Sequence, residues 1–533
     1  MSAMQDNTNP LERTTSDMTQ LIMKPPGKPS KAAISPTREQ NFPEWFQSVI
    51  TDADLAENSR IRGCMVLKPN GYAIWEQIQN QFDPLLKSLG VQNCAFPLFI
   101  PLSYFQREAK HAEGFATEVA VVTHRRLEKN AAGMLVPTTP LEEPLIVRPT
   151  SEMIIGDSMS RWVQSHRDLP LKLNQWCSVV RMEMRPRMFL RTTEFWWHEG
   201  HSAHATSAEA QHHTLEMFRL YKDFVTNTLA LPVIPGEKIP SERFAGAERT
   251  FSLEAMMQDK KALQAATSHY LGQNFAKAMS IQFQGSTGER EYAHTTSWGM
   301  STRIIGALIM VHADDDGLRL PPRIAPQQVI ILPIIPKEEI RSEVLEYARK
   351  VKDVLSNIIY HGRPLVVTVD ERDMRGGDKN WQAIKKGIPL RIEIGPKEVA
   401  SQELVLSRRD LPTGTKGTFS LDQVANGIVS LLDEQQASYY NQAKVLLDNN
   451  IRTDIKTLAE LKEFFGSTGE EDSPSGGRGW VRAKWCDDES TLTILKDLKL
   501  TVRCIPLDSD TSVGTCILTN RPATTEILIA KAY

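Results

Sequence analysis

Two stretches of alternating side chains, joined by a turn-like segment, constrain the fold of this chain more than any other feature. They are residues 171–184, LKLNQWCSVVRMEM, and residues 191–205, RTTEFWWHEGHSAHA, and the turn-like segment is EMRPRM. A period of two is typical of a β-strand, and it places Arg181 and Glu183 on one face of the first stretch. On one face of the second it places Arg191, Thr193, Phe195, Trp197, Glu199 and His201. We therefore expect an antiparallel strand pair with a face that is both charged and aromatic.

Such a face is either solvated or used to bind a ligand. Charged side chains are ordinary on the solvated face of an antiparallel sheet. Water-facing strands rarely align aromatic side chains, however, and Phe195 and Trp197 share the charged face. Because aromatic rings stack on flat groups and arginines neutralise anions, the pattern favours the floor of a ligand-binding cleft.

The histidines of HEGHSAH suggest a metal site, but their spacing argues against one. His198 and His201 are three residues apart on a predicted strand and therefore point to opposite faces. The helical HExxH spacing is also absent. We predict no metal ligands here and expect His212 and His213 at the surface.

Three further segments offer residue types that bind ligands: RPTSE (148–152), LQAATSHYLGQNF (263–275) and SWGMSTR (297–303). In the last, Gly299 would let a ligand approach the backbone closely. Arg303 would lie in the first turn of a helix, beside N–H groups that favour phosphate. Taken singly, each of these residues is equally well explained by a helix cap or a surface ion pair. No GxxxxGK[ST] loop is present, so a nucleotide would not be held by a Walker fold.

A chain of 533 residues is too long for one hydrophobic core and predicts about three domains. Residues 1–40 are polar and predict a disordered arm. The first segment, residues 41–325, is expected to contain a helix over 71–90 that leads into an edge strand. Near its end, residues 296–314 predict a short strand that runs into an amphipathic helix.

The remaining chain divides into two segments. The second segment, residues 326–435, alternates as βαβαβ, which predicts a largely parallel sheet. The third segment, residues 436–533, is interrupted by GSTGEEDSPSGGRG (466–479), which is typical of a loop or disorder.

The overall composition excludes several classes of protein. With a net charge of −3, any nucleic-acid partner must be met by a local basic surface. The apolar stretches, such as residues 329–335, are too short to span a bilayer. The six cysteines lack the density of a disulfide scaffold, which favours a reducing, cytoplasmic location.

Taken together and in order, these segments resemble the class II aminoacyl-tRNA synthetases and, more closely, the prolyl-tRNA synthetases of the archaeal and eukaryotic type. GYAIWEQIQ with FPLFIP is similar to motif 1, VVRMEM with FLRTTEFWWHEGHSA to motif 2, and SWGMSTRIIGAL to motif 3. RPTSE, TSHYLGQNF and the final KAY are similar to the prolyl branch. The resemblance runs from about residue 41 to Tyr533.

The resemblance implies a fold and an activity. The fold would be an α+β catalytic domain with the class II antiparallel sheet (41–325), an α/β anticodon-binding domain (326–435) and a small α+β C-terminal domain (436–533). The activity would be ATP-dependent ligation of L-proline to the 3′ end of tRNA(Pro) through a prolyl-adenylate, with Mg²⁺-bound ATP as substrate. The family also implies a cytoplasmic homodimer formed through motif 1, with no membrane partner.

The resemblance assigns roles to individual residues. Arg181 and Arg303 would be catalytic, because they would neutralise charge at the α-phosphate. Residues implied to bind ATP are Arg181, Glu183, Arg191, Thr192, Gln264, Thr267, Ser301 and Arg303; at position 301 the family usually has threonine. Residues implied to bind proline are Thr150, Glu152, Arg181, Trp197, Glu199, Phe244 and His269. Candidate anticodon contacts, which a solvated surface explains equally well, are Arg372, Lys379, Arg391, Arg408 and Arg409.

The third segment departs from the family pattern. Many relatives hold a structural zinc ion there with four cysteines. Here Cys486 and Cys516 remain, whereas the other thiolates would be replaced by Ser490 or Thr491 and by Thr519. Hydroxyls are poor zinc ligands. Cys504 corresponds to a cysteine that is not a ligand in relatives. We therefore predict no structural zinc and a core built on Trp485, Leu492, Ile494, Leu498 and Ile505.

Two further features follow from the resemblance. Fewer than a hundred residues separate Gly200 from Ser297, so the large editing insertion of the bacterial branch is expected to be absent. Tyr533 is expected to pack against the catalytic domain with its carboxylate near the site. The alternatives are another class II specificity and a non-catalytic, synthetase-like RNA-binding protein, although such proteins usually lose a motif arginine.

Overall fold

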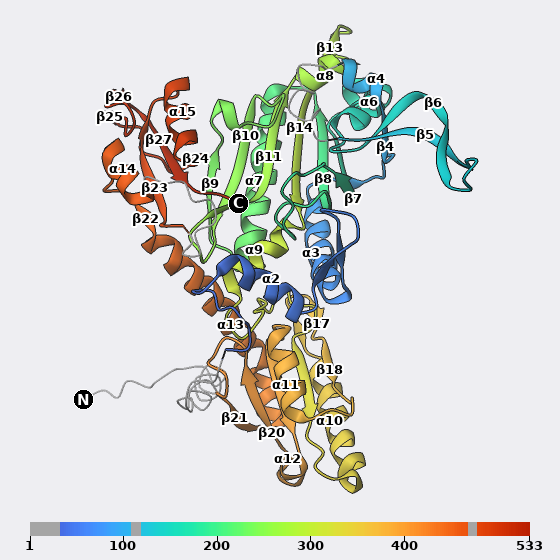
Figure 1. Ribbon diagram of the computed structural model, residues 1–533, viewed down its shortest axis with the longest axis vertical. Helices are drawn as coiled ribbons and strands as arrows, with labels where there is room; N and C mark the ends of the chain where they lie inside the picture. Colours follow the sequence, from blue (N-terminus) through green and yellow to red (C-terminus); the bar gives the residue numbers. More distant parts are fainter. Residues whose placement is uncertain (1–31, 108–118, 467–476) are drawn as a thin grey trace.

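The computed structural model describes residues 32–107, 119–466 and 477–533. Figure 1 shows the first segment at the centre, the second segment below it and the third segment beside it. Most of the predicted disordered arm lies outside the described residues. Residues 32–40 lie inside them, and there the prediction is wrong. Ile34 is buried and Arg38 pairs with Asp315 at 3.2 Å, because both side chains find partners on the first segment.

An eleven-stranded sheet runs through the first and third segments, in the order β22-β23-β27-β24-β9-β10-β11-β14-β8-β7-β3. The first segment supplies β3 (Gln92–Asn93), β7 (Leu171–Val180), β8 (Glu194–His204), β9 (Val233–Glu237), β10 (Arg249–Met256), β11 (Ala262–Gly272) and β14 (His294–Ser301). Strands β7 and β8 are antiparallel, and β3 pairs with β7 at the sheet edge. The predicted antiparallel pair and edge strand are therefore confirmed.

Both strands of the predicted pair are shorter than the alternating pattern. The chain leaves β7 at Val180 and enters β8 at Glu194. Between them Arg181 N–H donates to the carbonyl of Thr193 at 2.8 Å, which closes residues 181–193 into a loop. Arg191 and Thr193 therefore lie before the strand and not on its face. The reason is the turn around Pro186, which ends the extended backbone earlier than the side-chain pattern suggests.

Helices cover the sheet. They are α2 (Phe42–Asp52), α3 (Pro69–Ser88), α6 (Glu152–Trp162), α7 (Ser207–Asn227), α8 (Asn274–Ala278) and α9 (Arg303–His312). Tyr221 of α7 reaches His198 Nε2 at 2.9 Å, so α7 packs on the face of β8 opposite to Trp197. His213 of α7 is also buried, between the rings of His204 and Trp298, and its predicted surface position is wrong.

The helix after β14 differs from its prediction. Every residue of α9 from Ile304 to His312 is buried. A helix that is surrounded by protein on all sides has no solvent-exposed face that would need polar residues, so α9 is a core helix and not an amphipathic one.

Smaller elements complete the first segment. The strands β4 (Phe99–Pro101), β6 (Leu135–Val147) and β5 (Ala120–Lys129) form a separate sheet that projects from the molecule (Figure 1). The short elements are β1 (Ala56–Asn58), β2 (Met65–Leu67), α4 (Leu102–Arg107), β12 (Gln282–Gln284) and β13 (Arg290–Tyr292).

The second segment has its own five-stranded sheet, in the order β18-β15-β19-β20-β21, and its own core. Its elements are β15 (Val329–Pro333), α10 (Arg341–Ser356), β16 (Ile359–Tyr360), β17 (Arg363–Pro364), β18 (Val367–Val369), α11 (Gly376–Lys385), β19 (Leu390–Ile394), α12 (Pro396–Ser401), β20 (Glu403–Arg408) and β21 (Gly417–Ser420). Strands β18, β15 and β19 are parallel, as the βαβαβ pattern predicts. Strands β20 and β21 pair antiparallel, because the connection after β19 holds only the six-residue helix α12 and the connection after β20 holds no helix, which is too short for a parallel crossover.

The third segment extends the sheet of the first segment. Helix α13 (Leu421–Asn449) leaves the second segment and runs through the expected boundary at residue 436. It is followed by β22 (Ile451–Arg452), α14 (Leu458–Phe465), β23 (Trp480–Trp485), α15 (Glu489–Asp497), β24 (Thr501–Pro506), β25 (Gly514–Thr515), β26 (Pro522–Ala523) and β27 (Thr525–Ala530). Strand β24 pairs with β9, so one sheet crosses both segments.

A glycine permits this close junction. A Cβ atom on Gly236 of β9 would lie 2.4 Å from the sulfur of Cys504 and 2.7 Å from the carbonyl oxygen of Ile505. Only a residue without a side chain lets β24 approach β9 here. Among the described residues, no helix is both long and apolar enough to cross a membrane.

Candidate active site

One face of the sheet gathers the predicted ligand-binding side chains, because cross-strand neighbours stand in rows. One row across β7, β8, β14 and β11 is Gln175, Glu199, Gly299 and Thr267. The next, across β8, β14, β11 and β10, is His201, Ser297, His269 and Thr250. A cavity of about 250 Å³ lies over these rows.

Arg181 lies against the two aromatic residues of the charged face. Its guanidinium carbon is 5.5 Å from the ring centroid of Phe195 and 5.4 Å from that of Trp197, as in cation–π contacts. Its Nε donates to the carbonyl of Pro149 at 3.0 Å. The aromatic rings thus hold a cation at the cavity, which explains why a charged strand face carries them.

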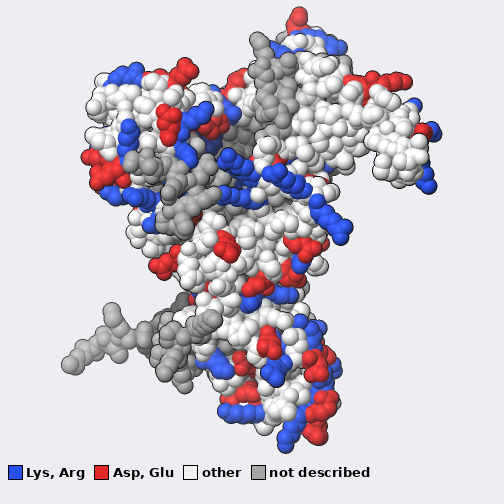
Figure 2. Space-filling view, in the orientation of Figure 1, with Lys and Arg blue, Asp and Glu red and all other residues white. Residues whose placement is uncertain are grey.

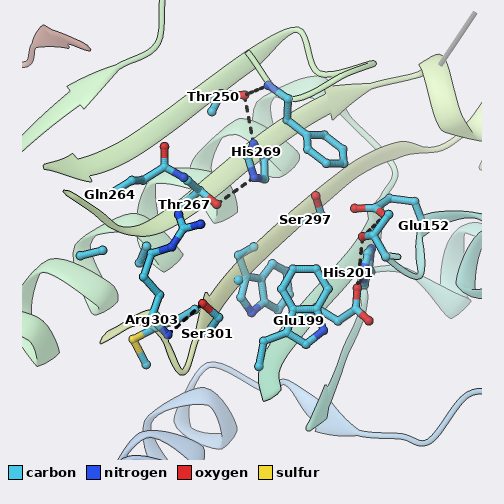
Figure 3. Close-up of a pocket in the computed structure, with 18 of the residues that line it drawn as sticks. Glu152, Glu199, His201, Thr250, Gln264, Thr267, His269, Ser297, Ser301 and Arg303 are labelled. Atoms are coloured by element: carbon cyan, nitrogen blue, oxygen red, sulfur yellow. Dashed lines mark hydrogen bonds and ion pairs between the residues drawn. The ribbon is translucent and has the colours of Figure 1, made fainter. Parts of the chain in front are cut away.

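Two carboxylates and a histidine form a buried network at one end of the cavity (Figure 3). Glu199 accepts hydrogen bonds from Gln175 Nε2 at 2.7 Å and from the Ser151 N–H at 3.1 Å. It also lies 3.2 Å from His201 Nε2. Burial disfavours its charge, but these partners hold the pKa of Glu199 below the ordinary value. Burial likewise opposes the charge of His201, whose pKa is nevertheless raised by its bond to Glu199.

The second carboxylate, Glu152, is the first residue of α6 and accepts a hydrogen bond from the Thr150 hydroxyl. Burial raises the pKa of Glu152, and the charge of Glu199 raises it further, against the opposing effect of His201. A cation bound beside Glu152 would favour its ionised form. This end of the cavity is therefore suited to a small ligand that carries a positive charge.

His269 lies across the cavity from the carboxylates. Its ring nitrogens are 3.0 Å from the hydroxyls of Thr250 and Thr267, and its ring centroid is 4.8 Å from that of Phe244. Burial lowers the pKa of His269 to about 3, with a smaller effect from His201. The imidazole is therefore neutral at pH 7 and does not repel a cationic ligand.

Arg303, the first residue of α9, leads into a second cavity of about 340 Å³ that shares a wall with the first. Its side-chain Nε donates to the carbonyl of Leu190 at 2.9 Å, and its backbone N–H donates to the Ser301 hydroxyl at 3.3 Å. Burial and neighbouring guanidinium groups lower the pKa of Arg303 to about 10, so it remains charged at pH 7. The second cavity is therefore suited to an anion.

The structure brings the two predicted residue sets to these cavities. The first cavity is lined by Thr150, Glu152, Arg181, Trp197, Glu199, Phe244 and His269, which were predicted to bind proline. Among residues predicted to bind ATP, those that line both cavities are Arg181, Gln264, Ser301 and Arg303. Thr267 lines only the first cavity, and those that line only the second are Glu183, Arg191 and Thr192.

Sequence comparison identifies the family. A proline–tRNA ligase of Protochlamydia amoebophila (strain UWE25) is 56% identical over 503 residues, which cover 94% of this chain and 99% of the relative. This chain belongs to the prolyl-tRNA synthetase family. A proline–tRNA ligase of Rhodopirellula baltica is 52% identical and covers 95% of this chain and 99% of its own length.

Family models and a solved structure agree with this membership of the prolyl-tRNA synthetases. The class II tRNA synthetase core domain (G, H, P, S and T) matches residues 137–312, an anticodon binding domain matches 328–431, and the prolyl-tRNA synthetase C-terminal domain matches 475–533. The crystal structure of prolyl-tRNA synthetase from Cryptosporidium parvum complexed with L-proline and AMP is 34% identical. It covers 95% of this chain and 98% of its own, with a TM-score of 0.83. The predicted family and fold class are confirmed.

Several residues of this prolyl-tRNA synthetase site were not assigned from the sequence. Phe195 and His201 could have been, because strand alternation places them on the same face as Trp197. Thr250 and Ser297 carry no sequence signal of their own. In the structure the Ser297 hydroxyl is buried in the cavity wall and makes no hydrogen bond to the described residues, which suits contact with a ligand.

The predicted anticodon contacts differ in their burial, and no comparison tests their role. Lys379, Arg391, Arg408 and Arg409 are all buried. Lys379 donates to the Asp370 carbonyl, and Arg391 donates to Asn380. Arg408 pairs with Asp410 and Glu434, and Arg409 pairs with Asp314. These bonds stabilise the packing of the second segment, and Arg409 also joins it to Asp314 of the first segment, which argues against direct contact of the four side chains with an RNA. Arg372 is exposed and pairs with Asp370 at 2.6 Å, so it is the most accessible of the five candidates, all of which stay predictions.

The zinc position of other prolyl-tRNA synthetases has few ligands here. The Cys486 N–H donates to the sulfur of Cys516 at 3.4 Å, so these two cysteines are neighbours. Thr491 uses its hydroxyl otherwise, accepting from Trp485 Nε1 at 2.9 Å. Cys504 packs elsewhere, against Gly236. Within the described ranges no group of three or more His, Cys, Asp or Glu side chains is placed to hold a metal ion.

Proposed function

We propose that this chain ligates L-proline to the 3′ end of tRNA(Pro) in two steps, through a prolyl-adenylate, with Mg²⁺-bound ATP as substrate. The observation that carries this proposal is that a site suited to a small cation and an arginine-rich cavity share a wall at Arg181 and Arg303. An amino acid and a nucleoside triphosphate would meet at that wall. Assignment to the archaeal and eukaryotic branch remains a prediction from the motifs.

Proline would lie in the first cavity. Glu152 would accept the charged secondary amine, with Thr150 and Glu199 orienting it. Trp197 and Phe244 would form apolar walls for the ring, and neutral His269 would close the pocket without repelling the amine. Arg181 would bind the carboxylate, since its guanidinium is held at the cavity by aromatic rings.

In the first step, a carboxylate oxygen of proline would attack the α-phosphorus of ATP. The bond from that phosphorus to the bridging β-phosphate oxygen would break, and pyrophosphate would leave. The reaction requires no proton transfer, so the protein contributes position and positive charge. Arg181 and Arg303 would stabilise the five-coordinate phosphorus. The other proposed ATP contacts are Glu183, Arg191, Thr192, Gln264, Thr267 and Ser301.

In the second step, a hydroxyl oxygen of the terminal ribose of tRNA would attack the carbonyl carbon of the adenylate. The bond from that carbon to the phosphate oxygen would break, AMP would leave with that oxygen, and the hydroxyl proton would be released to solvent. A basic surface supports the approach of the RNA. An opening beside the second cavity is lined by Arg185, Arg187, Arg191, Lys261, Lys499 and Lys531, among others. Figure 2 shows lysine and arginine side chains gathered over the middle of this face. Such a local surface offsets the net charge of −3.

We also propose a cytoplasmic homodimer formed through motif 1. Apolar side chains are exposed on and beside this motif, among them Tyr72, Leu85, Leu98 and Phe99. A second copy of the chain would cover them. The six cysteines form no disulfide, which suits a reducing compartment.

The chain between Gly200 and Ser297 supports the absence of editing in cis. This span forms part of β8, then α7, β9, β10, β11, α8, β12 and β13, and enters β14. These elements belong to the sheet, its helical cover and one small hairpin, which leaves no room in the sequence for a separate hydrolytic domain.

Proline-dependent exchange of pyrophosphate into ATP, followed by charging of tRNA(Pro), tests the proposed function. Exchange with proline and formation of prolyl-tRNA are expected. Exchange that depends on threonine or histidine would indicate another class II specificity. Binding of tRNA with no exchange for any amino acid would indicate a non-catalytic RNA-binding protein.

A further inference from the structure

A buried cluster of three charged residues joins the first and third segments at the wall of the second cavity. Glu254 on β10 is fully buried and accepts from Arg503 Nε at 3.0 Å and Nη2 at 2.7 Å. Its other oxygen accepts from Lys238 Nζ at 2.8 Å. Lys238 also donates to the carbonyl of Arg503 at 2.6 Å. The two cations line the second cavity, whereas Glu254 stands behind them.

The position of Arg503 depends on the continuous sheet. Arg503 lies on β24, 249 residues from Glu254 in sequence. The pairing of Ile505 with Glu237 and of Pro506 with Gly236 fixes β24 against β9, two residues beyond Arg503. The third segment thereby places a guanidinium in the same cavity as Arg191 and Arg303 of motifs 2 and 3.

The cluster has an unbalanced positive charge and N–H donors that its own hydrogen bonds do not use. One carboxylate and two cations leave a net charge of +1 in a buried place. Lys238 uses two of its three N–H donors on Glu254 and Arg503. Arg503 uses three of its five N–H donors, two on Glu254 and one on Thr501. Donors therefore remain, and a net positive charge in low dielectric attracts an anion more strongly than it would in water.

We propose that Lys238 and Arg503 bind the β- and γ-phosphates of ATP and the departing pyrophosphate, and that the third segment is therefore part of the active site. The proposal rests on the proposed function, since it assigns the phosphate end of the nucleotide to the second cavity. Glu254 is a positioning residue that holds both cations and does not itself touch the phosphates. A purely structural ion cluster would affect folding stability and leave nucleotide affinity unchanged.

The test compares charge removal inside and outside the cavity. Arg503→Met keeps most of the side-chain volume and removes the charge. Arg482→Met is the matched control, because Arg482 lies on β23, which β27 separates from β24 in the same sheet, pairs with Glu526 at 2.8 Å and lines neither cavity. Lys238→Met and the double variant Glu254→Gln/Arg503→Met remain available if Arg503→Met does not fold, because neither leaves Glu254 ionised without a partner.

In pyrophosphate exchange, we expect the KM for ATP and for pyrophosphate to rise about tenfold or more in the cavity variants, the size of one charge-assisted bond. The KM for proline should stay within about twofold, and Arg482→Met should match the parent chain in all three. Unchanged KM values for ATP and pyrophosphate, with only a lower melting temperature, would overturn the proposal.

Direct binding separates this proposal from the proposed function. ATP and inorganic pyrophosphate are titrated calorimetrically into the full chain without proline or tRNA. If the parent chain binds both but shows no proline-dependent exchange, the proposed function fails while the role of Lys238 and Arg503 is still measured. Equal affinities for parent and cavity variants would refute that role by itself.

Discussion

The guanidinium of Arg181 rests against two aromatic rings and lines both cavities. At the scale of single residues, this makes Arg181 a group that both proposed substrates would contact. We predict that Arg181→Met lowers kcat/KM in proline-dependent exchange by a factor of about 10²–10³, the usual cost of removing one charge-stabilising donor. The melting temperature should change little, because the truncated side chain borders a cavity.

Arg249 provides the control for Arg181→Met. It also lies over an aromatic ring, with its guanidinium carbon 4.9 Å from the ring centroid of Phe251, and it lines neither cavity. Arg249→Met should therefore leave exchange near the parent rate. Near-normal exchange by Arg181→Met would remove the central assignment of the site.

The carboxylate of Glu152 gives proline binding a pH dependence. Because burial raises the pKa of Glu152, its carboxyl is protonated at a higher pH than an ordinary glutamate. As pH falls through this raised pKa, the negative partner of the proline amine is lost, and the KM for proline should rise. Glu199 keeps its charge over this range because its pKa is lowered.

Exchange measured between about pH 5 and 8 at saturating ATP checks this dependence. Glu152→Gln should show weak proline binding throughout and a flatter pH profile. A KM for proline that is constant over the acidic range in the parent chain would contradict the assignment of Glu152.

At the scale of elements, the third segment folds around the buried hydroxyl of Thr491, at a position where the family resemblance implies a zinc ligand. We predict that the protein, purified without chelator, contains far less than one zinc per chain, and that chelator does not shift its melting temperature. Only Cys486 and Cys516 are neighbours there, and structural zinc needs four ligands. About one zinc per chain, lost when Cys486 is replaced, would show the prediction to be wrong.

The variant Thr491→Val tests how much this hydroxyl contributes to the free energy of unfolding. Thr491 is buried, and its hydroxyl accepts from Trp485 Nε1 and lies 3.0 Å from the Cys486 carbonyl. Its removal leaves a buried N–H without an acceptor and should lower the free energy of unfolding by ~1–3 kcal/mol. Thr493→Val, on the exposed side of the same helix, should be nearly neutral.

The local sequence pattern predicted the strands of the sheet and the residues that line the cavities better than it predicted the partners in ion pairs. Alternation identified β7 and β8, and the motifs identified residues that line the two cavities. The burial of four candidate anticodon residues was not foreseen from the sequence, and some of their partners are distant in sequence. Arg409 and Asp314, for example, are 95 residues apart. A single sequence shows where a charge lies along the chain, but not which distant carboxylate it meets.

At the scale of the whole molecule, Tyr533 links the third segment to the site. Its N–H donates to the carbonyl of Ala262 at 3.0 Å, its hydroxyl donates to Asp259, and its ring borders the second cavity. We predict that deleting Tyr533 lowers turnover in tRNA charging more than it lowers the melting temperature. Tyr533→Phe keeps the ring and should retain most of the turnover. An unchanged turnover number after deletion would indicate that the C-terminus lies near the site without contributing to catalysis.

The proposed absence of editing in cis bears on the accuracy of charging. A pocket sized for proline cannot strongly exclude smaller amino acids, since one methylene contributes only ~1–3 kcal/mol. We predict that the chain activates alanine, and cysteine to some extent, and leaves Ala-tRNA intact. Alanine-dependent exchange and the lifetime of Ala-tRNA incubated with the purified chain measure this. Rapid hydrolysis of Ala-tRNA would contradict it.

The pairing of β9 with β24 also bears on how the chain folds during its synthesis. Residues 238–500 lie between these two strands, and a ribosome that adds 5–20 residues each second needs about 13–53 s to make them. Throughout that interval β9 is an edge strand with unpaired N–H and C=O groups, which other chains can join. A nascent chain of this protein therefore passes through a period in which this edge is exposed to aggregation.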